Sequence, residues 1–320
     1  MGKIAILTSG GDAPGMNAAI RAVVRQGLYL GLEVYGIERG FAGLVRGSAF
    51  RRMEMGSVAG IIHRGGTILH TARAPEFLDE AVQRQAALRL KKEGITGLVV
   101  IGGDGSFRGA MALEKFGIKT ACIPGTIDND IAGTDSTIGF DTAVNTVLDA
   151  MNRLRDTATS HERFFVVEVM GRNNGLLALT AGLAGGAEAI LVPEIPYDLE
   201  SICRRLRQGI ERNKTHSLIL VAEGAASAFT IGREIEEKMG LETRVTVLGH
   251  IQRGGSPTAV DRILASRMGA AAARLLWEGR GGLMVGFKGG EIYPVPLMEA
   301  FIEKKSFPSE LYELALTLSR

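Results

Sequence analysis

Glycine placement is the feature that most constrains how this chain can fold. The 43 glycines among its 320 residues gather at the ends of short β-rich runs and do not form a flexible linker. Glycine permits the sharp bends by which an α/β chain passes from a strand into a helix. The sequence therefore predicts strands and helices in alternation, with glycines at the junctions.

Short apolar runs alternate with longer segments of helical period along the chain. The expected strands are residues 3–8, 34–37, 98–101, 120–123, 164–169, 189–192, 218–222 and 244–248. The expected helices are residues 16–30, 80–92, 106–116, 198–212 and 259–278, with a further long helix around 143–154. Such strands, separated by helices, indicate a parallel sheet covered on both faces, which binds ligands at the carboxyl ends of its strands.

Composition excludes several classes of protein. Lys and Arg number 37 against 35 for Asp and Glu, and this net charge of +2 argues against a broad nucleic-acid or membrane surface. Cys122 and Cys203 form no CxxC pair, so neither a disulfide framework nor a thiolate zinc site is supported. No apolar run reaches the roughly 18 residues that span a bilayer, and no signal peptide precedes the first strand, so we expect a cytoplasmic protein.

Residues 8–17 link the first expected strand to its helix. Gly10 and Gly11 let the backbone approach a ligand closely, and the helix N-terminus offers free N–H groups to an anion. A tight turn that binds no phosphate is the alternative. The chain has no GxxxxGK[ST] motif and this loop has no GxGxxG, which excludes a Walker-type P-loop and argues against a dinucleotide-binding Rossmann unit.

Two further strand-end loops add carboxylates. Asp104 lies between glycines, where it can hold Mg²⁺ while neighbouring N–H groups bind phosphate oxygens. The alternative is that Asp104 and Ser106 only cap the next helix. Asp128 and Asp130 alternate within residues 124–130, so an extended backbone would point both the same way, although a solvated turn is the alternative. Three such loops predict a polyphosphate–Mg²⁺ site suited to phosphoryl transfer.

The second half of the chain supplies cations after its strands. Met170-Gly171-Arg172 follows one strand, and residues 249–255 (GHIQRGG) follow another. Arginine forks match phosphate geometry and stay charged, so together these residues suggest a second, phosphorylated ligand. A single arginine is more often a surface residue, and His250 alone could be structural.

Five motifs carry a specific resemblance: residues 8–12, 102–106, 124–130, 170–172 and 249–255. From residue 3 to about 286 the chain resembles the bacterial ATP-dependent 6-phosphofructokinases. The resemblance implies transfer of the ATP γ-phosphoryl group to the 1-hydroxyl of fructose 6-phosphate, giving fructose 1,6-bisphosphate in glycolysis. It also implies an α/β fold of two similar doubly wound Rossmann-like domains with mainly parallel sheets, and an active site in the cleft between them. The ATP-binding domain would comprise residues 1–138 and about 252–306, and the sugar-phosphate-binding domain 139–251 and about 307–320.

The resemblance also implies roles for residues. Those expected to hold ATP are Gly11, Arg73, Ala74, Gly103, Asp104, Gly105 and Ser106, with Asp104 on Mg²⁺. Asp128 would be the catalytic base, with Thr126 and Asp130 beside it, and Arg172 would steady the γ-phosphoryl group. Those expected to bind the sugar phosphate are Thr126, Ile127, Asp128, Met170, Gly171, Arg172, Glu223, His250, Ile251, Gln252 and Arg253. Arg163 and Arg244 would reach it from a neighbouring subunit of a homotetramer.

Two positions bear on the phosphoryl donor. Pyrophosphate-using relatives carry Asp where this chain has Gly105 and Lys where it has Gly125. A carboxylate at position 105 would crowd and repel the α-phosphate of a nucleotide. We therefore expect ATP as the donor.

An effector site for ADP as activator and phosphoenolpyruvate as inhibitor is also implied. The residues that match it are Arg21, Arg25, Arg155, Gly186, Ala187, Glu188, Arg212, Lys214, Thr215 and His216. However, Met55 stands where relatives often have Arg, and Gly60 where they have Asp. Each loss removes a charged contact, so we expect both effects to be weakened.

Two other functions compete with this interpretation. NAD kinases and diacylglycerol kinases also carry a Gly-Gly-Asp-Gly loop, but they lack the motif at residues 250–255. A non-catalytic nucleotide sensor would need no base, and the presence of Asp104, Asp128, Asp130 and Arg172 argues against it. Residues 283–320 match the family weakly, and the sequence predicts no packing for them.

Overall fold

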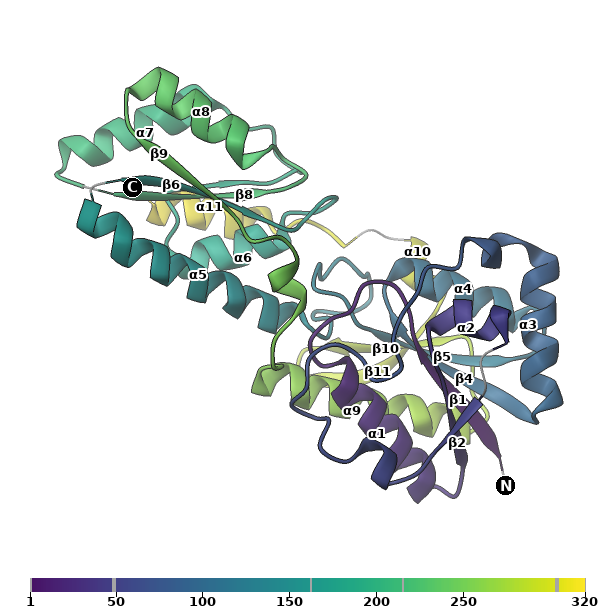
Figure 1. Ribbon diagram of the computed structural model, residues 1–320. Helices are drawn as coiled ribbons and strands as arrows, with labels where there is room; N and C mark the ends of the chain where they lie inside the picture. Colours follow the sequence, from purple (N-terminus) through teal and green to yellow (C-terminus); the bar gives the residue numbers. More distant parts are fainter. Residues whose placement is uncertain (1, 48–49, 162, 215, 303–304, 320) are drawn as a thin grey trace. The chain divides into compact units, whose positions relative to one another are not determined.

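The computed structural model describes residues 2–47, 50–161, 163–214, 216–302 and 305–319. The chain divides into two compact units (Figure 1). Unit 1 comprises Met1–Thr142 and Arg253–Lys305, and unit 2 comprises Ala143–Gln252 and Ser306–Arg320. Both are built of strands and helices in alternation, so the predicted α/β class with mainly parallel sheets is confirmed.

Unit 1 is organised around a seven-stranded sheet of order β11-β10-β5-β4-β1-β2-β3. The strands are β1 (Lys3–Thr8), β2 (Glu33–Ile37), β3 (Phe50–Met53), β4 (Ile95–Gly102), β5 (Lys119–Pro124), β10 (Leu283–Lys288) and β11 (Glu291–Pro296). The five central strands run parallel, and the two edge strands β3 and β11 pair antiparallel with their neighbours. The carboxyl ends of β1, β4 and β5 are therefore adjacent.

Helices cover both faces of this sheet (Figure 1). They are α1 (Met16–Tyr29), α2 (Gly40–Arg46), α3 (Glu80–Lys92), α4 (Asp104–Glu114), α9 (Ala259–Trp277) and α10 (Glu299–Ile302), with short 3₁₀ turns at Gly56–Val58 and Pro75–Leu78. Phe107, Leu90 and Leu44 join strand residues in one fully buried core beneath α2, α3 and α4. On the opposite face α1 packs closely on α9, because a Cβ at Gly269 would lie only 2.7 Å from the Ala19 carbonyl oxygen.

Unit 2 contains a four-stranded parallel sheet of order β7-β8-β6-β9. Its strands are β6 (Phe164–Val169), β7 (Ala189–Leu191), β8 (Ser217–Ala222) and β9 (Thr243–Val247). Its helices are α5 (Phe140–His161), α6 (Leu176–Gly185), α7 (Leu199–Glu211), α8 (Ala228–Met239) and α11 (Ser309–Leu318), with a 3₁₀ turn at Gly249–Arg253. In Figure 1, α7 and α8 cover one face, and α5, α6 and α11 cover the other.

A buried carboxylate fixes the start of α5 to the start of α9 within unit 1. Asp261 is 1% exposed and accepts hydrogen bonds from the main-chain N–H groups of Gly139 and Thr142, each at 2.8 Å. It also accepts the Thr142 hydroxyl at 2.5 Å. Burial raises the pKa of Asp261, and these three donors oppose that rise. The carboxylate therefore satisfies donors that would otherwise be buried without partners.

We expect Asp261→Ala to destabilise unit 1 by about 3 kcal/mol, because it leaves buried donors unpaired. The midpoint of thermal unfolding should fall by about 6–12 °C in differential scanning calorimetry. Asp149→Ala is the matched control, since the Asp149 side chain is 66% exposed and forms a surface ion pair with Arg153. An unchanged midpoint in Asp261→Ala would show that the hydrogen bonds of Asp261 contribute little.

Candidate active site

The three glycine-rich loops after β1, β4 and β5 lie side by side. Thr8 is in register with Ile101, and Gly102 with Pro124. Beyond the strands, the Ser9 N–H donates to the Ile101 carbonyl and the Gly125 N–H donates to the Gly102 carbonyl, both at 3.0 Å. The prediction that these loops meet at one sheet edge is confirmed.

Close backbone approach in these loops requires glycine at position 102. A Cβ there would lie 2.5 Å from both the Ser9 carbonyl oxygen and the Ser106 hydroxyl. The first loop is held from outside by Thr71, whose hydroxyl donates to the Gly10 carbonyl at 2.7 Å. Position 105 differs, because a Cβ on Gly105 would meet no atom within 4 Å. Space for a ligand therefore adjoins Gly105, while Gly102 serves the packing of the loops.

Asp104 is the first residue of α4 and does not cap the helix. The N-cap is Gly103, which makes no side-chain cap hydrogen bond, so the capping alternative for Asp104 is wrong. The carboxylate is 51% exposed and forms an ion pair with Arg108 at 3.1 Å, one turn along the helix. The Asp104 carboxylate is thus accessible at a helix N-terminus, where its oxygens can serve as ligands for a cation.

Asp128 and Asp130 flank a residue in the left-handed region. Asn129 has φ +53°, so the expectation of an extended backbone through this loop is wrong. Thr126 instead holds Asp128, because its hydroxyl accepts the Asp128 N–H at 3.2 Å and donates to the carboxylate at 3.4 Å. Burial raises the pKa of Asp130, and the negative charges of Asp128 and Asp104 raise it further. Asp130 as a whole is nevertheless exposed at the surface, so the surrounding loop reduces the hydration of its carboxyl group without enclosing it.

The remaining residues predicted for ATP differ in their surroundings. Arg73 is exposed, whereas Ala74 packs against the buried core of unit 1. Gly11 lies against the guanidinium of Arg253, whose Nη1 donates to the Asp12 carbonyl at 3.4 Å. Arg253, which was predicted to bind the sugar phosphate, therefore lies beside the first glycine-rich loop.

In unit 2 the predicted sugar-phosphate residues gather at the carboxyl ends of β6, β8 and β9. The Glu223 N–H donates to the Val169 carbonyl at 2.9 Å, and the Leu248 N–H donates to the Glu168 carbonyl at 3.0 Å. Gln252 is fully buried and accepts the Met170 N–H at 3.2 Å, which ties the turn at Gly249–Arg253 to β6.

Exposed side chains extend from this edge of unit 2. Arg172, Glu223, His250 and Ile251 are all open to solvent. Gly171 has φ +137°, and its carbonyl accepts the Gly224 N–H at 3.2 Å. A Cβ at Gly224 would lie 2.0 Å from the Arg172 carbonyl oxygen. A glycine is needed there for the loop to present Arg172, a requirement that the sequence analysis missed.

Arg163 and Arg244 lie near the amino-terminal ends of β6 and β9, opposite the carboxyl ends described above. Phe165, near the start of β6, is in register with Arg244, whereas Met170 follows the end of β6. At about 3.3 Å per residue, five residues separate these positions by roughly 16 Å. Both arginines pair with Glu242, Arg163 at 3.1 Å and Arg244 more closely. A single chain therefore does not bring them together with Met170.

The predicted effector residues of unit 2 gather near the amino end of β8. Glu188 pairs with Lys214 at 2.5 Å and accepts the Leu218 N–H at 2.5 Å. Arg155 donates to the carbonyls of Gly185 and Gly186. His216 lies 3.4 Å from the Thr159 hydroxyl. The remaining positions are Ala187, which is buried, Arg212, which is exposed, and Thr215, which lies outside the described residues.

Arg21 and Arg25 are on α1 of unit 1. The Nε of Arg25 is buried and has no hydrogen-bond partner among the atoms of the described chain. A buried guanidinium nitrogen without an acceptor is costly, and an anionic ligand would satisfy it.

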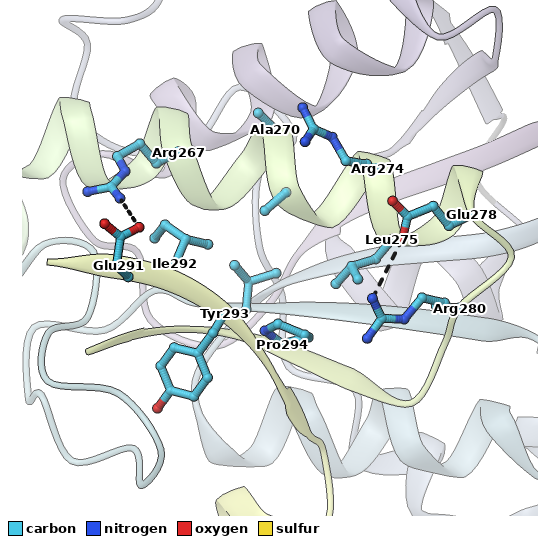
Figure 2. Close-up of a pocket in the computed structure, with 12 residues that line it drawn as sticks. Arg267, Ala270, Arg274, Leu275, Glu278, Arg280, Glu291, Ile292, Tyr293 and Pro294 are labelled. Carbon is cyan, nitrogen blue, oxygen red and sulfur yellow. Dashed lines mark ion pairs between the residues drawn. The ribbon is translucent and has the colours of Figure 1, made fainter. Parts of the chain in front are cut away.

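A cavity of about 420 Å³ opens in unit 1 between α9 and the β10–β11 hairpin (Figure 2). Its lining includes Arg267, Arg274 and Arg280, and none of the predicted site residues. Arg267 pairs with Glu291 at 3.8 Å, and Arg280 pairs with Glu278 at 3.5 Å. Arg267 and Arg280 are therefore already balanced by carboxylates of the same unit.

The described residues contain neither a ready-made metal-binding cluster nor a helix able to span a membrane. No group of three or more His, Cys, Asp or Glu side chains among them is arranged to hold a metal ion by itself. Within the same ranges, every helix is too short or too polar to cross a membrane.

Lys305 is a residue near the third loop that the sequence analysis missed. Its Nζ donates to Asn129 Oδ1 at 3.0 Å and to the Asp135 carbonyl at 2.8 Å. It lies in the stretch that matches the family weakly, and an isolated lysine carries no motif. Only the folded chain brings it to Asn129.

Comparisons with known proteins agree with this geometry. The profile of the phosphofructokinase family matches residues 3–276. The ATP-dependent 6-phosphofructokinases of Bacillus cytotoxicus and Halalkalibacterium halodurans are 58% and 59% identical over 319 residues, and each match covers 100% of both chains.

Solved structures extend the comparison to the fold. The phosphofructokinase of Saccharomyces cerevisiae superposes with a TM-score of 0.90 at 36% identity, covering 100% of this chain and 48% of the yeast chain. A pyrophosphate-dependent phosphofructokinase from Marinobacter aquaeolei has a TM-score of 0.88 at 22% identity, covering 97% of this chain and 86% of the other, and so shares the fold. On the family profile and the full-length identities, this chain belongs to the phosphofructokinase family.

Proposed function

We propose that this chain transfers the γ-phosphoryl group of ATP to the 1-hydroxyl of fructose 6-phosphate, giving fructose 1,6-bisphosphate and ADP. The observation that carries the proposal is the meeting of three glycine-rich loops with Asp104, Asp128 and Asp130 at one sheet edge. Relatives named ATP-dependent 6-phosphofructokinase, with 58% and 59% identity, support it. Phosphoryl transfer depends mainly on positioning and charge stabilisation, which such loops can provide.

The donor would lie along the loops after β1 and β4. Gly103 and Gly105 would offer main-chain N–H groups at the N-terminus of α4, Gly11 would offer one from the first loop, and Arg73 adds an exposed charge. The Ser106 N–H is already bonded to the Gly103 carbonyl, so Ser106 would contribute through its side chain. Asp104 suits Mg²⁺, because its carboxylate is accessible and Mg²⁺ takes one or two carboxylates together with substrate phosphates. Bound there, the ion would neutralise charge on the phosphates. Ala74 would contribute apolar contact beside them.

Asp128 would accept the proton of the attacking hydroxyl. The Thr126 hydroxyl accepts the Asp128 main-chain N–H and donates to its carboxylate, which orients the carboxylate as a general base requires. The nearby negative charges of Asp128 and Asp104 raise the pKa of Asp130, and a bound Mg²⁺ would offset them. Ile127 is buried, so it would shape the loop through packing.

Unit 2 would bind the sugar phosphate at the loops after β6, β8 and β9. Arg172, Glu223 and His250 are exposed there and combine a cation with hydrogen-bond acceptors. Arg172 would stabilise charge on the transferring group. Met170, Gly171, Ile251 and Gln252 would define the shape of the site, and Arg253 would act beside Gly11.

Arg163 and Arg244 would serve a neighbouring subunit. Within one chain they lie near the amino ends of the strands, whereas Met170 follows the carboxyl end of β6. They could therefore contact a sugar phosphate only in the site of another subunit. This separation supports active sites shared between subunits, and we propose that the assembly is a homotetramer. Both residues also carry fixed positive charge suited to a phosphate group.

The experiment for the proposed function is product analysis by ³¹P NMR. Purified protein with ATP, Mg²⁺ and fructose 6-phosphate should yield ADP and a new phosphate ester at carbon 1. A protein that consumed ATP only with a different acceptor, or bound ATP without turnover, would overturn the proposal in favour of another kinase or a sensor.

The family resemblance also implies an effector site, and the residues at positions 55 and 60 allow a separate prediction about it. Met55 is 48% exposed, and Gly60 has φ +66° with no atom within 4 Å of an added Cβ. The double variant Met55→Arg/Gly60→Asp should therefore fold, since Asp tolerates this φ. One charged contact is worth about 1.5–3 kcal/mol when well made, which is already about tenfold or more in affinity, so ADP should shift the fructose 6-phosphate saturation curve at least about tenfold more than in the parent.

The measurement is the substrate saturation curve with and without ADP. Leu88→Arg is the control for the new arginine, because Leu88 is 57% exposed on α3 and its replacement adds one positive charge to unit 1, as Met55→Arg does. If the parent already shows a full ADP response, the inferred weakening by Met55 and Gly60 is wrong.

A further inference from the structure

Lys305 connects two sides of the loop that carries the proposed base. It is the last residue of unit 1 before the chain passes to unit 2. Its Nζ contacts the Asn129 side chain at 3.0 Å and the Asp135 main chain at 2.8 Å. Asn129 lies between Asp128 and Asp130 in the sequence and has a positive φ. The ammonium group therefore contacts the loop at its residue in the left-handed conformation.

The Asn129 side chain is the centre of this arrangement. It is 6% exposed, and its Oδ1 accepts both the Thr137 N–H and the Lys305 ammonium at 3.0 Å. Its Nδ2 donates at 3.2 Å to the same Asp135 carbonyl that Lys305 contacts. Lys305 and Asn129 thus close a hydrogen-bonded ring across the loop. This ring offsets the strain of a non-glycine residue at positive φ.

Charge adds to the effect of these contacts. The charged groups that act on Lys305 are Asp135 and Asp130, which raise its pKa, while burial lowers the pKa to about 8. At neutral pH most of the ammonium is therefore protonated and can donate to both oxygens. It also lies close enough to Asp130 to lower the pKa of that carboxyl.

We propose that Lys305 is a positioning residue for phosphoryl transfer, which holds the Asp128–Asp130 loop through Asn129 and the Asp135 main chain. The proposal rests on the proposed role of Asp128 as base. Lys305 acts through the loop, and a displacement of the base by about 1 Å can cost about 10²-fold in rate. The sequence offered no indication of this role.

The test compares full-length Lys305→Met and Lys305→Arg with the parent in steady-state kinetics. Lys305→Met should lower kcat about tenfold or more, with KM for ATP and fructose 6-phosphate changed by less than about threefold. Lys305→Arg should restore at least part of kcat, because the guanidinium can donate to the same two oxygens. Lys115→Met, at an exposed lysine after α4, is the matched control.

A second readout does not depend on activity. The Thr137 amide is bonded to Asn129 Oδ1, so hydrogen exchange in peptides spanning residues 126–139 should be faster in Lys305→Met and unchanged in Lys115→Met. Parental kcat in Lys305→Met, or parental exchange in that segment, overturns the proposal. If the parent itself fails to phosphorylate fructose 6-phosphate, the proposed function fails, and the exchange result still decides whether Lys305 holds the loop.

Discussion

Replacing Asp128 with Ser is expected to lower kcat for ATP-dependent phosphorylation of fructose 6-phosphate by at least about 10²-fold. The carboxylate is the acceptor for the hydroxyl proton, and a serine hydroxyl cannot take that proton near neutral pH. Thr126 loses its bond to the carboxylate, but the main-chain N–H of residue 128 still donates to the Thr126 hydroxyl. The loop should therefore keep its shape, and KM values should change much less than kcat.

Two controls make this result interpretable. Asp149→Ser removes an exposed carboxylate in an i,i+4 pair and should leave kcat unchanged. Asp128→Asn keeps the size of the side chain without its basicity and should lose a similar factor. Undiminished turnover in Asp128→Ser would mean that another group accepts the proton.

Replacing Gly105 with Asp should lower kcat/KM for ATP by about 10²-fold or more. A carboxylate about 4 Å from a phosphate oxygen is repelled by about 4 kcal/mol at an effective dielectric constant of about 20. The protein itself should fold, because an added Cβ at this position meets no atom within 4 Å. The loss would therefore report on the ligand that occupies this space.

Gly105→Ala is the matched control, and it should change kcat/KM for ATP by no more than a few fold. Gly125→Lys is a poorer test of donor choice, because its Cβ would lie 3.0 Å from Ile101 Cγ2 and 3.3 Å from Met16 Cε. A defect in that variant could come from disturbed packing. Retention of full ATP use in Gly105→Asp would place the triphosphate elsewhere.

The fold could be predicted where a local pattern determines the element. β6 (Phe164–Val169) and α3 (Glu80–Lys92) were expected at the bounds that the structure has, because β6 is a short, nearly continuous apolar run and α3 has apolar residues at helical spacing. α6 was missed because it is apolar on every side and so shows no amphipathic period. The β10–β11 hairpin was missed although Gly289 and Gly290, both at positive φ, form a typical two-residue turn.

The site could be predicted only where its residues lie in contiguous motifs. The loops after β1, β4 and β5 meet because each motif follows the carboxyl end of a strand, and these three parallel strands are neighbours in the sheet. The backbone at Asn129 could not be predicted, since its positive φ is held by contacts with Thr137 and Lys305. Lys305 is distant in sequence, and long-range hydrogen bonds leave no local signal.

The central claim is that three adjacent strand ends bind a nucleoside triphosphate for transfer to a sugar phosphate. The most direct measurement is parallel turnover of fructose 6-phosphate by the purified parent with ATP and with pyrophosphate. We predict a kcat/KM for ATP at least about 10²-fold above that for pyrophosphate, because glycine at position 105 leaves room for the nucleotide. Faster turnover with pyrophosphate would contradict the account.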